Sequence, residues 1–425
     1  MQNQSFARLL SASILVFTSG LSGLACTAQA DLPASFQPTL LDADAVTAVR
    51  DDIQAGEATP EQIAALAELV NKADESLEMP IRSVIEKPQA PASGSLHDYV
   101  SLSPYWWPNP DTDDGLPYVR RDGEFNPERD QYDVPKLSDL SNAVRWLGFA
   151  YYYTGNEAYA KNAIERCRVW FVDPATRMTP RVQFGQFIPG VEDEGRHFGI
   201  IETVRLRWFP DAFAMLEGSP HMTDDLREGV RQWFADYADW LTNSEFGVAE
   251  RTYPNNHGTW ANAQIANYAW FGGREDLARA AVESIPARIE HQIMSDGLQP
   301  HEAERTTSLH YHDFNLRAYL DLAKIGQRLD IDLYHFETEE GASIRKAAEF
   351  LVPYLLEQKE WPYEQIRDPK AYMHAQAMRM AALAYDEPAF EETLPVLMTW
   401  PGMKPEGLVY TELLLPNLQV PAETP

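Results

Sequence analysis

The sequence has little cysteine, few basic residues and, after residue 30, no long apolar run. Two cysteines in 425 residues cannot supply a disulfide framework, so packing must hold the fold together. Lysine and arginine number 35 against 64 aspartate and glutamate, a net charge of −29, which disfavours binding to nucleic acid or to an anionic membrane surface. No later stretch approaches the roughly 18 consecutive apolar residues of a membrane span, so none is predicted.

The first thirty residues have the pattern of a cleaved secretory signal. Arg8 is followed by an apolar, small-residue stretch over residues 9–25 and by an Ala-Gln-Ala sequence that ends at Ala30. We therefore predict a signal peptide over residues 1–30, cleaved near Ala30, and a secreted or periplasmic protein. A buried N-terminal helix and a lipid anchor at Cys26 are the alternative interpretations.

Most of the remaining chain has the apolar spacing of amphipathic helices, with short Gly, Pro and Asn punctuation. The pattern predicts helices over residues 140–153, 157–171, 200–216, 223–241, 261–271, 275–294, 307–329, 341–356 and 371–383. Cys167 falls inside one of them and is most simply a core residue. Residues 31–425 contain no visible linker yet exceed the about 250–300 residues of one compact core. We therefore predict a single all-α domain, an (α/α) toroid barrel of helical hairpins.

Two segments interrupt the helical pattern. Residues 98–127 are rich in aromatic residues and proline, include Tyr105, Trp106 and Trp107, and cannot form a helix. Because long irregular loops in compact domains are usually lids or binding loops, we predict a lid over about 98–127. Residues 178–196 form the second segment, which carries the polar side chains Arg181, Gln183, Gln186 and Arg196.

A third segment, Tyr-Pro-Asn-Asn-His-Gly-Thr-Trp over residues 253–260, leads into a helix. Asn255, Asn256 and His257 place three hydrogen-bonding side chains at a helix N-terminus, where the free N–H groups favour negative charge. The alternative is that Asn256 only caps the helix. These side chains are candidates for binding an anionic group.

A fourth segment contains a candidate tyrosine. Thr306 or Thr307 is a plausible N-cap, which leaves Arg305 in the preceding loop and Tyr311 about one turn inside the helix. Glu304 lies seven residues before Tyr311, close to two helical turns, so we expect the two to share a face.

Other catalytic chemistries have weaker support in the sequence. His310 and His312 are two residues apart and would diverge on a helix, and no HExxH or cysteine-pair motif occurs, so we predict no metal site and no cofactor. No GxSxG motif supports a serine hydrolase. Acid pairs for glycoside hydrolysis remain possible and are Glu302 with Glu304 or Asp193 with Glu194.

Taken together, these segments resemble the alginate-lyase-domain superfamily of polysaccharide lyases, over roughly residues 80–390. The resemblance rests on residues 178–190 with 195–203, the Asn-Asn-His-Gly-Thr-Trp run at 255–260, Arg305 with the Tyr-His-Asp-Phe run at 311–314, and the Tyr-Trp-Trp-Pro-Asn-Pro run at 105–110. It implies an (α/α) toroid barrel and lyase activity on polyuronates, which in the closest-looking branch are glucuronan or mannuronate-rich alginate. It also implies His257 and Tyr311 as a catalytic pair, with Asn256 as a helper.

The same residues suit β-elimination of a uronate. That reaction needs neutralisation of the sugar carboxylate, removal of the C5 proton and protonation of the departing C4 oxygen. Asn256, His257, Gln186 and Arg305 are suitable carboxylate donors. Tyr311 can act as both base and acid, because the two reacting groups lie on one face of glucuronate and of mannuronate. A separate base role for His257 is the alternative.

A strongly acidic protein that binds an anionic polymer needs a locally basic groove. The arginines of the non-helical segments could form it, or could be salt-bridged surface residues: Arg120, Arg121, Arg181, Arg196, Arg251 and Arg305. Tyr105, Trp106 and Trp107 could stack on sugar faces or pack against the barrel. We predict a polyuronate lyase that binds an anionic polysaccharide also through Gln183 and Glu304. A glycoside hydrolase on the same fold and a non-catalytic, polysaccharide-binding envelope protein are the alternatives.

Overall fold

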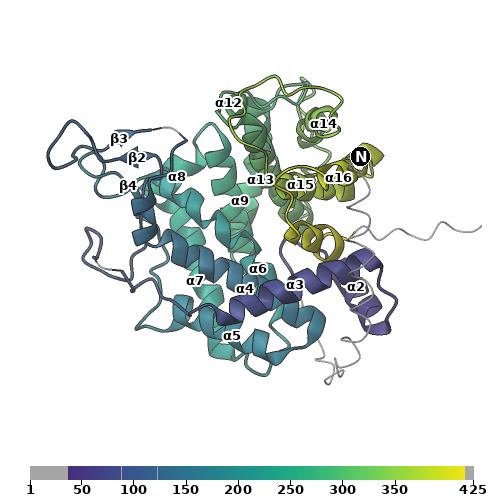
Figure 1. Ribbon diagram of the computed structural model, residues 1–425, viewed down its shortest axis with the longest axis horizontal. Coiled ribbons are helices and arrows are strands. Elements are labelled where there is room, and N and C mark those ends of the chain that lie inside the picture. The colour runs from purple at the N-terminus through teal and green to yellow at the C-terminus, as the bar shows by residue number, and fades with distance from the viewer. Residues whose placement is uncertain (1–36, 88, 122, 417–425) are drawn as a thin grey trace, which may run out of the picture.

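The computed structural model describes residues 37–416, apart from residues 88 and 122 (Figure 1). The predicted signal peptide and the alternative anchor site Cys26 lie outside these described residues. Regular structure in the described part is mostly helical, which confirms the predicted all-α class. No helix there is long and apolar enough to cross a bilayer.

Hairpins of one inner and one outer helix build the toroid. The inner helices are α4 (Val134–Thr154), α9 (Asn256–Phe271), α13 (Ser308–Arg328) and α15 (Ala371–Tyr385). Their outer partners are α3 (Pro60–Glu78) and α5 (Glu157–Cys167) on α4, α7 (Asp224–Asn243) and α10 (Glu275–Glu283) on α9, α14 (Ile344–Leu355) on α13 and α16 (Pro388–Leu397) on α15. The inner helix α9 is buried on nearly every side, whereas the outer helix α7 exposes its charged face. In a ring with a central core, the inner helices are covered on all sides, whereas the outer helices bury one face and expose the other.

Shorter elements complete and close the ring. They are α2 (Ala43–Ala55), the 3-10 helices η2 (Pro127–Gln131) and η4 (His197–Trp208), the π-helices η3 (Arg168–Val172) and η5 (Val409–Leu414), and α6 (Phe209–Met215), α8 (Glu245–Arg251), α11 (Ile285–Gln292), α12 (Pro300–Ala303) and α17 (Glu406–Leu408). The C-terminal elements α17 and η5 contact α3, near the other end of the chain. Tyr153 donates a hydrogen bond to the carbonyl of Leu413, and Arg145 donates one to Tyr410 at 2.7 Å. These bonds join the last hairpin to the first.

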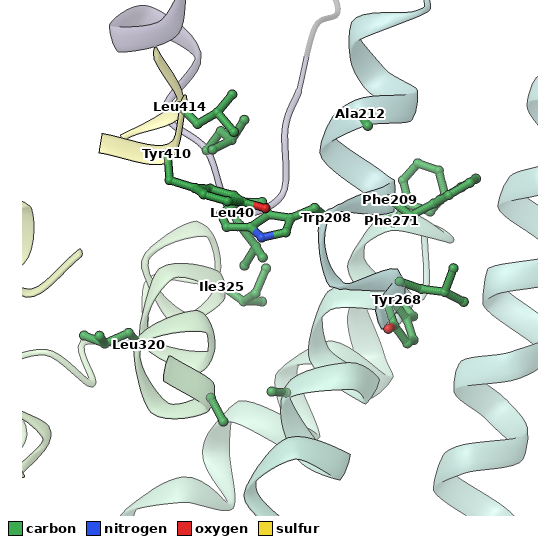
Figure 2. Packing of buried hydrophobic residues seen from close by; sticks show 14 of the residues in the cluster. Leu40, Trp208, Phe209, Ala212, Tyr268, Phe271, Leu320, Ile325, Tyr410 and Leu414 are labelled. Atoms are coloured by element: carbon green, nitrogen blue, oxygen red, sulfur yellow. The ribbon is translucent and has the colours of Figure 1, made fainter. Parts of the chain in front are cut away.

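Aromatic packing fills the interior. Figure 2 shows Trp208 of η4 beside Tyr410 of η5, with ring centroids 5.7 Å apart, next to Leu40. Phe209 and Phe271 meet edge to face with centroids 6.4 Å apart. Cys167 is buried and free, as predicted for a core residue.

The helix predicted from residue 140 begins at Val134, and the helix predicted over 157–171 continues from Arg168 as a π-helix. Three further predictions differ from the structure for local reasons. The segment 275–294 is two helices, because Pro286 lacks the N–H that would continue the first one. The segment 200–216 is a 3-10 helix that becomes α-helical only at Phe209. The helix predicted from residue 261 begins at Asn256, where the side chain of Asn255 caps it.

The non-helical segments 98–127 and 178–196 pair with each other. Strand β1 (Val100–Leu102) is parallel to β4 (Phe184–Phe187), and β2 (Trp106–Trp107) is antiparallel to β3 (Val119–Arg120). The lid segment 98–127 is therefore partly a β-hairpin, at the opposite side of the molecule from α14 and α16 (Figure 1). Arg367 donates a hydrogen bond to the carbonyl of Gly123 and lies over the ring of Phe125. The loop before α15 thus contacts the segment that follows β3.

Candidate active site

Two neighbouring helix N-termini, those of α9 and α13, position the candidate residues. Trp260 of α9 packs on Phe314 of α13 with ring centroids 4.9 Å apart. The cap of α9 is Asn255, whose side chain accepts a hydrogen bond from the backbone N–H of His257 at 3.0 Å. The interpretation that Asn256 caps this helix is therefore wrong, and its side chain is available for another role.

A buried carboxylate holds Asn256. Glu302 is 1% exposed and accepts hydrogen bonds from the backbone N–H of Asn256 at 2.7 Å and from its Nδ2 at 2.6 Å. Burial raises the pKa of Glu302 to about 7, against the lowering effect of these two bonds. Within the described residues, the buried Oδ1 of Asn256 has no hydrogen-bond partner. An amide held in this way is preorganised for a ligand.

Arg305 and Tyr311 are in direct contact. The Nη2 group of Arg305 donates a hydrogen bond to the Tyr311 hydroxyl at 2.8 Å, and its guanidinium carbon lies 3.8 Å from the centre of the Tyr311 ring. Burial raises the pKa of Tyr311 to about 12, although the positive charge of Arg305 lowers it. Tyr105 of the lid segment also hydrogen-bonds the Tyr311 side chain and raises its pKa. The predicted lid segment therefore contacts Tyr311, the candidate base and acid of the sequence analysis.

His257 shares a carboxylate with a second histidine. Its Nδ1 donates to Oε1 of Glu250 at 2.6 Å, and the Nδ1 of His197 donates to Oε2 of the same residue at 2.7 Å. The sequence analysis did not identify Glu250 or His197. His197 adjoins Arg196 within a segment that carries the family resemblance, but nothing in the sequence links it to Glu250.

Gln186 has a strained backbone. Its φ of +52° is in the left-handed region that side chains other than glycine rarely adopt. Its backbone N–H donates to Oγ of Ser101 at 2.8 Å, and that hydroxyl donates to the buried Glu202 at 2.6 Å. Non-glycine residues held in this region cluster at ligand-binding sites. The half-buried Gln183 lies three residues earlier, just before strand β4.

Two of the arginines that were predicted to line a basic groove are instead paired with carboxylates. Arg181 makes two hydrogen bonds to Asp98, at 2.9 and 2.8 Å, and Arg196 forms an ion pair with Glu192. The alternative interpretation, salt-bridged surface arginines, holds for both. Of the others, Arg120 is exposed, Arg251 is half-buried, Arg121 lies 5.1 Å from the Trp107 ring, and Arg305 contacts Tyr311.

A different set of cations gathers around Lys370, near His310. Burial lowers the pKa of Lys370, and four neighbouring cations lower it further: Arg317, Lys404, Arg205 and Arg367. Arg205 donates to the Ser138 hydroxyl at 2.9 Å and to the backbone of Glu202 at 3.0 Å. Burial lowers the pKa of His310, next to Tyr311, to about 3, and Arg317 and Lys370 contribute. The sequence analysis did not identify this basic cluster.

Trp106 and Trp107 form strand β2, and both are half-buried. The indole N–H of Trp107 donates to the carbonyl of Glu124 at 3.1 Å. Their role as a stacking surface or as packing remains a prediction.

The acidic pairs considered for hydrolysis are not arranged as expected. Glu304 follows the short helix α12, and α13 begins only at Ser308, so the expectation that Glu304 shares a helix face with Tyr311 is wrong. Glu304 is exposed, whereas Glu302 is buried. Asp193 is also exposed, and its carboxylate accepts the Gly190 N–H at 2.9 Å. In the part of the chain that the structure describes, no cluster of three or more His, Cys, Asp or Glu residues could hold a metal ion.

Comparisons with known proteins give matches in both sequence and fold. The family model for alginate lyase matches residues 83–361. An alginate lyase from Bacteroides ovatus is similar at 35% identity and a TM-score of 0.82, covering 88% of this chain and 99% of that one. Alginate lyase A1-III from Sphingomonas species A1 shares the fold at 18% identity and a TM-score of 0.54, covering 89% and 99%. A variant of A1-III complexed with a tetrasaccharide has a TM-score of 0.57 at 18% identity, covering 92% and 98%. No curated protein matches.

Proposed function

Because the chain belongs to the alginate lyase family of polysaccharide lyases, we propose that it cleaves a β-1,4-linked polyuronate by syn β-elimination. The substrate is glucuronan or mannuronate-rich alginate, and the products carry unsaturated uronate ends. The observation that carries the proposal is the contact between Arg305 and the Tyr311 hydroxyl, together with Glu302, which holds Asn256 and interacts electrostatically with Arg305 and His257.

In this proposal Tyr311 transfers the protons. Its phenolate takes the C5 proton, the electron pair forms the C4–C5 double bond, and the C4–oxygen bond breaks. The same hydroxyl then gives the proton to the departing oxygen on the same face of the sugar. Arg305 stabilises the phenolate, because its guanidinium donates to that oxygen at 2.8 Å.

The carboxylate of the reacting sugar is bound by donors at the N-terminus of α9, which are the Nδ2 hydrogen of Asn256 that Glu302 does not accept and the imidazole of His257. Asn256 is held by Glu302, and His257 is held by Glu250, so both side chains are oriented before substrate arrives. Gln186 is a further donor from strand β4. These groups stabilise the negative charge that moves onto the carboxylate when the C5 proton leaves.

The basic cluster around Lys370 and the lid support a polyanionic substrate. Lys370, Arg205 and Arg367 attract further uronate carboxylates, in a protein whose total charge is −29, whereas Arg317 is buried and paired with Asp313. Tyr105 contacts Tyr311, and Trp106 and Trp107 provide flat apolar surfaces for sugar rings. Alginate is the substrate named for the similar Bacteroides ovatus enzyme. Glucuronate and mannuronate differ only at C2, so this mechanism serves both.

The test is a panel of purified uronans, read for the ultraviolet absorbance of unsaturated uronate. The wild-type enzyme should produce that signal on glucuronan or mannuronate-rich alginate, and Tyr311→Phe should lose it with an unchanged circular dichroism spectrum, because only the proton-transfer group is removed. New reducing ends without absorbance would indicate a glycoside hydrolase instead. Binding without shortening of the polymer would indicate a binding protein.

We also propose that residues 31–425 form one catalytic domain that acts outside the cytoplasm after cleavage near Ala30. The A-x-A sequence and the apolar stretch before it support this proposal. Mass spectrometry of the exported protein should give the mass of residues 31–425, whereas a lipid-modified N-terminus at Cys26 would contradict it.

A further inference from the structure

Three elements that are separate in the sequence converge on one carboxylate. Glu250 is at the end of α8, His257 is in the first turn of α9, and His197 begins η4. Each carboxylate oxygen of Glu250 accepts a hydrogen bond from the Nδ1 of one imidazole, at 2.6 and 2.7 Å. Because the two histidines come from different elements, their hydrogen bonds to Glu250 do not cap one helix or close one turn.

The burial of the three side chains differs in a way that suggests a role. The Glu250 side chain is 1% exposed, whereas those of His197 and His257 are 24% and 19% exposed. Both rings pack against Phe198, with centroids 4.0 and 5.0 Å from it. The carboxylate is thus buried behind two imidazoles that reach toward the surface. Because Nδ1 is occupied on both rings, Nε2 is the nitrogen that each ring has left for a ligand.

The charges around the cluster are mixed. Burial alone would raise the pKa of Glu250, but His257 and His197 outweigh it and hold this pKa below its ordinary value. Arg196 interacts electrostatically with Glu250, Tyr253 packs near the His197 ring, and Glu302 interacts electrostatically with His257. Glu250 therefore remains an acceptor for both imidazoles at neutral pH.

We propose that Glu250 is a positioning residue that fixes the Nδ1–H tautomer of His257, and that it recruits His197 as a second imidazole for the carboxylate of the reacting sugar. This inference rests on the proposed lyase function. An imidazole that gives its Nδ1 hydrogen to Glu250 donates from Nε2 only when it is protonated on both nitrogens. Carboxylate binding therefore requires the doubly protonated form of the imidazole, with Glu250 as its counter-ion.

The variant Glu250→Gln tests whether Glu250 orients the two imidazoles or only fills space in the core. An amide has the same shape, but it offers one acceptor and one donor where the carboxylate offers two acceptors. One of the two histidines must then change to the Nε2–H tautomer. The matched control is Asp211→Asn, because Asp211 is also fully buried and accepts bonds from Leu40 and Leu41 at 3.0 Å, but it holds only the N-terminal segment.

The first measurement is nitrogen NMR of histidine in the wild-type enzyme, assigned with His197→Gln and His257→Gln. We expect the Nδ1–H tautomer at both positions at alkaline pH, and a change at one of them in Glu250→Gln. An Nε2–H tautomer at either position in the wild type would overturn the proposal. This readout needs no substrate, so it distinguishes failure of the positioning role from failure of the lyase function, which would appear as no absorbance on any uronan.

The second measurement is the split between KM and kcat. Glu250→Gln should lose about 10- to 100-fold in kcat/KM, mainly through KM, since a charge-assisted bond to an anion-binding group is lost. Asp211→Asn should lower the melting temperature and leave both constants unchanged. Wild-type kinetics in Glu250→Gln would overturn the proposal. If Glu250→Gln does not fold, Glu250→Asp provides the kinetic test, because the shorter side chain keeps the charge but cannot span both rings.

Discussion

Replacement of Arg305 by glutamine gives the most direct test of how Tyr311 works. The guanidinium donates to the Tyr311 hydroxyl at 2.8 Å and lies over the same ring. A hydrogen bond between a charged group and a buried partner contributes about 1.5–3 kcal/mol. If that bond strengthens when Tyr311 becomes a phenolate, its loss should lower kcat/KM by about 10- to 150-fold.

The pH dependence carries further information. With a pKa of about 12, only a small fraction of Tyr311 is ionised near neutral pH. If the phenolate is the base, the rate should rise about tenfold for each pH unit below that pKa, until the protein unfolds. Removal of the positive charge of Arg305 raises this pKa further, so Arg305→Gln should have lower rates at each pH and the same upward slope.

The assay is the initial rate of absorbance increase on mannuronate-rich alginate or glucuronan, measured across neutral and alkaline pH. Arg274→Gln is the matched control, because it removes one positive charge from an arginine that is 38% exposed and pairs with Asp276. Arg305→Lys keeps the charge and should fall between the wild type and Arg305→Gln. An Arg305→Gln enzyme with wild-type rates, or rates that do not depend on pH, would refute the assigned roles of Arg305 and Tyr311.

Three other variants test the surroundings of the site. Glu302 has a pKa near 7, against an ordinary value of 4.5, so its burial weakens the fold as pH rises from 4.5 to about 7. Glu302→Gln should remove roughly 3 kcal/mol of that pH dependence, measured by urea unfolding at several pH values. Gly199→Ala would place a methyl group 2.6 Å from the Cα of Gly185; unfolding should show a loss of about 1–3 kcal/mol, and displacement of Gln186 should lower activity. Lys370→Gln should raise KM for the polymer, and a difference from wild type that persists at high salt would contradict an electrostatic role.

The short sequence motifs locate the candidate site because their residues are close together along the chain. The Asn-Asn-His run places Asn256 and His257 within one turn, and Arg305 precedes Tyr311 by less than two turns. The expectation for Glu304 failed for an equally local reason. The short helix α12 ends before it and α13 starts after it, so the two residues do not belong to one continuous helix.

The arginines show the limit of reasoning from charge alone. Arg181 and Arg196 look like Arg305 in the sequence, since all three lie in non-helical segments. Only the fold places Asp98 against Arg181, 83 residues away, and leaves Arg305 beside a tyrosine. The cations that gather around Lys370 lie on inner helices, connecting segments and the 3-10 helix η4, and no spacing in the sequence joins them.

By itself the sequence determined the helical class, the family and the motifs that carry Asn256, His257 and Tyr311, because apolar periodicity and short motifs depend on neighbours along the chain. The tertiary structure alone decided the partners of those residues. His197 and Glu250 are 53 residues apart, and Asn256 and Glu302 are 46 apart. Burial pushes the pKa of Glu302 upward and opposing imidazoles hold that of Glu250 down, and both effects arise only when the ring closes and excludes water.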